Sequence, residues 1–172
     1  GPVSSDSLAR GLAYTPVNGD VVVCSPPRSG TTWMQWTVHQ ILQRGRSDPP
    51  NIRAVSPWLE SRTPDGATHS TFEHATLDVT PMPRAVKTHL ALGVVRVTDE
   101  AKYILVLRDP ADALVSRYHH QSEIRGWRFA PSLSGVLERE INMSADEEDD
   151  DQRGMKKGWA SFVAQSWEHV NR

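Results

Sequence analysis

The stretch DVVVCSPPRSGTTWMQW, residues 20–36, decides the fold. Residues 21–24 are apolar and mostly β-branched, which is typical of a strand buried on both faces of a parallel sheet. Residues 25–30 interrupt this run, and from Thr31 to about Arg44 the apolar residues recur with helical spacing. The pattern therefore predicts a strand, a tight loop and a helix that Gly45 ends. The apolar face of this helix is expected to contain Trp33, Met34, Thr37, Val38, Ile41 and Leu42.

The loop between this strand and this helix is suited to binding an anion. Such a connection presents free backbone N–H groups and the positive end of the helix dipole to a ligand, and phosphate is the commonest one. Gly30 lets the backbone come close, Thr31 and Thr32 supply hydroxyl groups, and Arg28 supplies a fixed positive charge. The alternative is an ordinary strand-to-helix connection, which does not need this combination of residues.

The loop differs from the P-loop of nucleoside triphosphatases, G-x-x-x-x-G-K-[ST]. The first Gly would fall at Ser25 and the Lys at Thr31, so triphosphate hydrolysis is disfavoured. Residues 27–33, PRSGTTW, instead resemble the 5′-phosphosulfate loop of sulfotransferases that use 3′-phosphoadenosine 5′-phosphosulfate (PAPS), with the pattern P-[KR]-[ST]-G-[TN]-T-W. The resemblance implies that the cofactor is bound by Arg28, Ser29, Gly30, Thr31, Thr32 and Trp33.

A second informative stretch contains Lys87 and His89. Ala85 and Val86 predict a short strand, on which Lys87 and His89 would point to the same side. A neutral His can take a proton near neutral pH, and a Lys can hold an anionic group during its transfer. The pair alone also fits a solvated strand end. Its order after the loop resembles the K-[TS]-H segment of the same family. That resemblance implies that His89 is the general base and contacts the acceptor, while Lys87 and Arg28 stabilise the transferred group.

A third stretch, residues 101–120, reads AKYILVLRDPADALVSRYHH. We predict a second doubly buried strand over Tyr103–Leu107, followed by a helix that Asp109 caps and Pro110 begins. Arg108 would then lie at the carboxyl edge of the sheet, where open parallel sheets bind ligands. This stretch resembles the 3′-phosphate motif of the family, which implies that Arg108 and Ser116 hold the 3′-phosphate of PAPS.

The segment between the first two motifs is expected to border the acceptor. Residues 45–82 are rich in Pro, Ser, Thr, Asp and Gly and have no clear period. Trp58, within Ser56–Glu60, either forms a wall of the acceptor pocket or anchors the loop on the core, and both readings stay open. Together with Phe72 it favours an apolar or aromatic acceptor. His69 and His74 lack further ligands at metal-binding spacing and are read as surface residues, so no metal site is predicted.

The last part of the chain is predicted to pack on the sheet after an acidic loop. Residues 146–151 are six consecutive acids inside a region, 144–154, that we expect to be a mobile, solvated loop and not a calcium site. Residues 155–170 predict an amphipathic packing helix whose apolar face contains Trp159, Phe162, Val163, Trp167 and Val170.

Length and composition limit the class of protein. The 172 residues predict a single domain over 1–172. The strand–loop–helix pattern predicts an α/β class with a central parallel sheet flanked by helices, and the resemblance implies a P-loop-like form in three layers. The parts are an N-terminal segment (3–19), the phosphosulfate-loop unit (20–44), the acceptor-side region (45–82), the two further motifs (83–124), the acidic loop and the last helix. The net charge of −2 does not indicate nucleic acid, and no apolar run is long enough to span a bilayer. The lone Cys24 fits a reducing, cytoplasmic location, and a homodimer is compatible with the sequence.

The three motifs together predict transfer of a sulfuryl group from PAPS to a hydroxyl or amine of a small-molecule acceptor, with PAP as product and no metal. Two alternatives remain. A non-catalytic module could bind PAP, PAPS or a partner protein, and a kinase could carry a degenerate P-loop, although the missing Lys after Gly30 disfavours the kinase. Members of the family usually continue well beyond the point where this chain stops, so we expect it to lack a C-terminal part.

Overall fold

The structure is a computed structural model that describes residues 3–61, 76–125, 132–138 and 159–170. His69, Phe72 and His74 lie outside the described residues, and so do the acidic loop 144–154 and the first residues of the predicted helix 155–170. Among the described helices, none is both long enough and apolar enough to cross a bilayer.

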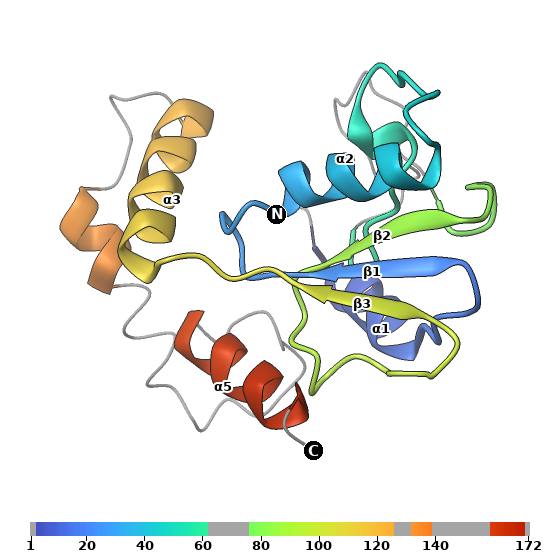
Figure 1. Cartoon of the computed structure of the whole chain (residues 1–172). Coiled ribbons are helices and arrows are strands. Elements are labelled where there is room, and N and C mark those ends of the chain that lie inside the picture. Colours follow the sequence, from blue (N-terminus) through green and yellow to red (C-terminus); the bar gives the residue numbers. More distant parts are fainter. Residues whose placement is uncertain (1–2, 62–75, 126–131, 139–158, 171–172) are drawn as a thin grey trace.

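The centre of the fold is a parallel sheet of three strands in the order β2-β1-β3 (Figure 1). These are β1 (Asp20–Cys24), β2 (Arg84–Thr88) and β3 (Lys102–Leu105). Every residue of β1 is buried, as its apolar run predicts. Cys24 lies opposite Thr88 on one side and Leu105 on the other, so the three strands end at the same edge. The residues that follow them are therefore delivered to one place.

Helices cover both faces of the sheet and confirm the predicted three-layer α/β arrangement (Figure 1). Helix α2 (Thr31–Leu42) packs on one face, where Val38 meets Val21, Val23 and Ala85. Helices α1 (Ser5–Ala13) and α5 (Trp159–Val170) cover the other face. There Leu8 of α1 and Phe162 of α5 share a core with Val22 and Cys24. Helix α3 (Pro110–Arg125) follows β3 beyond the carboxyl edge.

The buried face of α2 differs from the predicted one. Trp33 and Ile41, expected on the apolar face, are 70% and 69% exposed, whereas Gln35 and His39 are buried. Apolar residues occur around much of this helix, so their spacing alone does not select a face. Burial of the two polar residues is tolerated because each has a partner: Gln35 Nε2 donates to Ser56 Oγ at 2.8 Å, and His39 Nε2 lies 2.9 Å from Ser47 Oγ.

The end of α2 also departs slightly from the sequence prediction. The helix stops at Leu42, two residues before Arg44. Arg44 and Gly45 both take positive φ angles, 54° and 68°. The left-handed conformation that ends the helix therefore begins one residue before the glycine.

Strand β3 is shorter and more exposed than predicted. It stops at Leu105, its first residue is exposed and the other three are only partly buried, and Leu107 is 43% exposed. Among the described strands β3 pairs only with β1, so it lies at an edge of the sheet. The doubly buried strand expected over Tyr103–Leu107 was wrong because an apolar run does not reveal an edge position.

Only part of the predicted face of α5 packs on the sheet. Phe162 is buried, but Trp167 and Val170 are 63% and 59% exposed. Ser166 lies in the contact instead, where its hydroxyl oxygen accepts a hydrogen bond from Leu92 N at 3.3 Å. Gly93 lies against the backbone of the same helix, so closely that a Cβ at this position would be 2.9 Å from the carbonyl oxygen of Gln165.

A buried ion pair fixes the amino ends of β1 and β2. Arg84 Nε donates to Asp20 Oδ1 at 2.8 Å, and both side chains are almost fully buried. Tyr14 also donates its hydroxyl to Asp20, and burial, reinforced by that carboxylate, raises the pKa of Tyr14 to about 12. Arg84 further donates to the carbonyl oxygens of Leu77 and Thr80. The network joins the N-terminal segment and the 76–80 turn to the sheet.

Candidate active site

A cavity of about 1270 Å³ lies at the carboxyl edge of the sheet. It brings together nearly all the predicted site residues, from four separate segments of the chain. Those that line it are Arg28, Gly30, Thr31, Thr32, Trp33, Trp58, Lys87, His89, Arg108 and Ser116. Ser29 does not line the cavity; it is 4% exposed, and its hydroxyl has no hydrogen-bond partner among the described residues.

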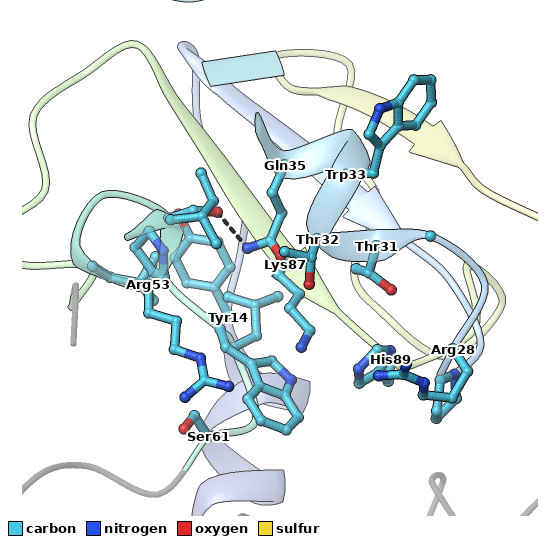
Figure 2. Close-up of a pocket in the computed structure, with 18 of the residues that line it drawn as sticks. Tyr14, Arg28, Thr31, Thr32, Trp33, Gln35, Arg53, Ser61, Lys87 and His89 are labelled. Carbon is cyan, nitrogen blue, oxygen red and sulfur yellow. Dashed lines mark hydrogen bonds between the residues drawn. The ribbon is translucent and has the colours of Figure 1, made fainter. Parts of the chain in front are cut away.

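The loop after β1 leads to a helix start that can present backbone N–H groups to an anion. Gly30 is the N-cap of α2 with φ 97°, and no side chain in the described part of the chain caps the helix. The first backbone N–H groups of α2 therefore have neither an intrahelical partner nor a side-chain cap. Figure 2 shows the hydroxyls of Thr31 and Thr32 on the side that faces Lys87 and His89. Thr31 Oγ1 lies 2.5 Å from Ser25 Oγ, which fixes its rotamer.

Trp33 lies at the rim of the cavity. Its indole ring points away from Lys87 and His89 in Figure 2, in keeping with its 70% exposure. The role in cofactor binding that the sequence implies for Trp33 stays a prediction.

Arg28 joins the loop after β1 to the motif after β3. Its Nε donates to Ser116 Oγ at 3.2 Å, and Arg108 Nη1 donates to the backbone oxygen of Arg28 at 3.2 Å. Asp109 caps α3 as predicted, since its Oδ1 accepts from Ala111 N at 2.9 Å and Asp112 N at 3.2 Å. The two segments that the sequence assigns to separate phosphate groups therefore form one continuous polar surface.

Trp58 both anchors its loop and lines the cavity. Its segment pairs with β2, where Lys87 N donates to Pro57 O at 2.7 Å and Leu59 N donates to Lys87 O at 3.0 Å. The ammonium group of Lys87 lies 3.9 Å from the centroid of the Trp58 ring, a cation–π contact. The His89 ring stands edge-on to the indole at 5.4 Å. The two readings of Trp58 that the sequence left open are thus compatible.

The environment of Lys87 favours its neutral form. Burial lowers the pKa of Lys87 to about 8; Glu60 opposes this effect, whereas Arg53 and Arg28 add to it. The charge of Lys87 is therefore present at neutral pH and is lost within the mildly alkaline range.

The ring of His89 is held in one tautomer. Nδ1 lies 2.8 Å from the backbone oxygen of Ser25, and because a carbonyl oxygen can only accept, Nδ1 carries the proton. Nε2 is then the acceptor. Burial, with a further contribution from Lys87, lowers the pKa of His89 to about 3. The ring is neutral at pH 7, and Nε2 is available to accept a proton.

Two residues that the sequence analysis did not select also shape the site. Glu60 is fully buried, and its carboxylate accepts from His89 N at 2.5 Å and Thr88 Oγ1 at 2.9 Å. Burial raises the pKa of Glu60. Arg53, on the short helix η1 (Ile52–Ala54), lines the cavity. Both residues lie in the segment 45–82, which has no hydrophobic periodicity from which their positions could be predicted. Within it, only the short stretch Ser56–Glu60 was notable in the sequence.

The described residues contain no cluster of three or more His, Cys, Asp or Glu side chains that could hold a metal ion. The cavity is instead rich in positive charge and hydrogen-bond donors. Such a set of groups suits a ligand that carries several phosphate or sulfate groups.

Comparison with known proteins gives the family. A family model described as the sulfotransferase domain matches residues 18–171. A glycolipid sulfotransferase of Mycobacterium tuberculosis is 35% identical over 109 residues, which are 62% of this chain and 32% of that protein. Sulfotransferase 1A1 of Rattus norvegicus is 34% identical over 112 residues, again 62% of this chain and 37% of that protein. The matched part therefore spans only about a third of the length of these relatives.

Solved structures share the fold. Mouse sulfotransferase SULT7A1 complexed with PAP superposes with a TM-score of 0.66 at 21% identity, over 99% of this chain and 55% of that one. A putative steroid sulphotransferase of Arabidopsis thaliana gives 0.53 at 17% identity, over 97% of this chain and 66% of that one. Because the family model matches most of its length, the chain belongs to the sulfotransferase family.

Proposed function

We propose that the protein transfers the sulfuryl group of PAPS to a hydroxyl or amine of a small-molecule acceptor. The observation that carries the proposal is the hydrogen bond from Arg28 to Ser116. It brings two predicted phosphate-binding segments into one cavity, with Lys87 and His89 beside them. Family membership supports the reaction class. The acceptor, the cytoplasmic location, the single-domain organisation and a homodimer stay predictions.

The residues of the cavity fit PAPS. The start of α2, which no side chain of the described residues caps, is suited to a phosphate at the loop. Arg108 and Ser116 offer a second set of donors that suits a 3′-phosphate. Arg28 lies between the two sets and can contribute its charge to both.

When bound, PAPS supplies the sulfuryl group and the leaving 5′-phosphate. The protein's part is to bind, to orient and to accept a proton. His89 Nε2 can take the proton of the acceptor hydroxyl, because Nδ1 is committed to Ser25 O and the ring is neutral. The low pKa keeps the base form populated, and it also makes His89 a weak base until a negative ligand lies beside it.

Lys87 is suited to neutralise negative charge next to His89. Its ammonium group rests on the Trp58 ring and is free to approach an anion in the cavity. Glu60 fixes the backbone of the turn that carries His89. Positioning and preorganised charge of this kind supply most of the acceleration in related phosphoryl-transfer reactions.

Replacement of His89 tests the proposal. We expect His89→Ala to lower the rate of sulfuryl transfer from labelled PAPS by 10²–10⁴-fold, the usual contribution of a general base. The affinity for PAP, measured by calorimetry, should change little. The control is His119→Ala, because His119 is exposed and does not line the cavity. A His89→Ala protein that transfers at nearly the wild-type rate would exclude His89 as the base. PAP binding without any turnover in the wild type, with a range of phenols and amines, would favour a non-catalytic module.

A further inference from the structure

Arg53 lies on the far side of Lys87 from the phosphate loop. Figure 2 shows the amino group of Lys87 between the guanidinium of Arg53 on one side and His89 and Arg28 on the other. Arg28 belongs to the proposed cofactor side through its bond to Ser116. Arg53 therefore lies across Lys87 from the groups that are suited to the cofactor.

The backbone around Arg53 is held by hydrogen bonds and by burial of its neighbour. Asn51 caps η1 by accepting from Ala54 N at 3.1 Å, and Ile52 is 5% exposed. Two residues after η1, Ser56 Oγ donates to Ala85 O of β2 at 3.0 Å and accepts from Gln35 of α2. The guanidinium therefore projects from a rigid turn that is bonded both to the sheet and to a helix.

Among the described residues, no acidic side chain forms an ion pair with Arg53. Its guanidinium also makes no hydrogen bond within the described chain. Apart from Asp78, no acidic side chain among the described residues lines the cavity. Burial is the main cause of the lowered pKa values of Lys87 and His120, and the positive charge of Arg53 adds to the lowering at both. Positive side chains outnumber the acidic ones in the described lining of the cavity, and such an excess of positive charge attracts an anion.

The cofactor does not account for Arg53, because the donors suited to its phosphates lie around Arg28, Arg108 and the start of α2. We infer that the acceptor carries an acidic group that Arg53 binds, on an apolar or aromatic body that lies against Trp58. This inference rests on the proposed function and narrows its acceptor to anionic hydroxyl or amine compounds.

A matched pair of phenols tests the inference. The probes are 4-hydroxyphenylacetate and the neutral 4-hydroxyphenylacetamide, titrated into the PAP-saturated protein in a calorimeter at low ionic strength. We expect the carboxylate to bind about tenfold or more tightly, since a charge-assisted hydrogen bond is worth at least that factor. Arg53→Gln should remove the difference and Arg53→Lys should keep part of it. Arg46→Gln, an exposed arginine that does not line the cavity, is the control and should change nothing.

Each outcome decides a separate point. Equal binding of the two phenols by the wild type, no binding of either, or a preference that survives in Arg53→Gln would overturn the inference while leaving the proposed function standing. A PAP affinity that falls tenfold in Arg53→Gln would assign Arg53 to the cofactor and also overturn it. A wild-type protein that does not bind PAP would instead contradict the proposed function itself.

Discussion

At the scale of single residues, Lys87 gives the site a charge that titrates close to neutral pH. Its pKa of about 8 follows first from burial, and the neighbouring arginines strengthen the effect. An anion bound beside Lys87 favours the charged form and raises this pKa. By linkage, the protonated protein must then bind the anion more tightly than the deprotonated protein.

We therefore expect the affinity for PAP to weaken as the pH rises above about 8. The phosphates of PAP are already fully ionised in that range, since their second pKa lies near 6. The dissociation constant should rise by up to tenfold per pH unit between pH 8 and the pKa of Lys87 in the complex. Lys87→Arg should bind PAP with no such dependence, because an arginine keeps its charge. Calorimetry from pH 7.5 to 9.5, with the exposed Lys102→Met as control, makes the measurement. A slope that persists in Lys87→Arg would assign the titration to another group.

Local sequence patterns identified Lys87 and Trp58 as site residues but did not predict that they are in contact. Both residues were selected from the sequence, Lys87 for its place beside His89 and Trp58 for its place in the Ser56–Glu60 island. Their contact depends on a backbone pairing between segments nearly thirty positions apart, which no local pattern contains. The same is true of Glu60, whose importance becomes visible only when His89 N and Thr88 Oγ1 are found bonded to it.

At the scale of elements, Gly93 controls how closely α5 approaches the sheet. A Cβ at this position would lie 2.9 Å from a backbone oxygen of α5, and backbone cannot yield as a flexible side chain can. We expect Gly93→Ala to lower the free energy of unfolding by about 1–3 kcal/mol, the usual cost of overpacking. Urea denaturation measures it. PAP affinity should be nearly unchanged, because α5 does not line the cavity.

Gly135→Ala is the matched control. A Cβ there would meet only the side-chain oxygen of Ser132 at 3.3 Å, inside the helical turn 133–138. Because alanine favours a helix more than glycine does, Gly135→Ala should leave the free energy of unfolding unchanged or raise it by up to about 1 kcal/mol. Equal stability of the Gly93→Ala and wild-type proteins would contradict the close contact between Gly93 and the backbone of α5.

Elements were predicted well where the signal is local. Asp109 and Pro110 define the start of α3 because capping involves neighbouring residues only. The prediction of the buried face of α2 was partly wrong, because burial depends on which face of the helix packs on the sheet. The edge position of β3 could not be predicted either, since strand order is a property of the whole sheet.

At the scale of the whole molecule, the cavity exists because parallel strands end together. Cys24, Thr88 and Leu105 are in register, so the residues after each strand meet although they are far apart in the sequence. The sequence could predict that these motifs would gather, because each lies at or just after the carboxyl end of a predicted strand. It could not predict Arg53, which reaches the cavity from a region without periodicity.

The most direct test is a calorimetric titration of the protein with PAP and, in parallel, with 5′-AMP, which lacks the 3′-phosphate. If Arg108, Ser116 and the loop after β1 form one nucleotide site, PAP should bind in the micromolar range and 5′-AMP at least about tenfold more weakly. Arg108→Gln should bring the PAP affinity down toward that of 5′-AMP. Equal affinity for the two nucleotides, or no binding of PAP, would contradict the proposed PAPS site.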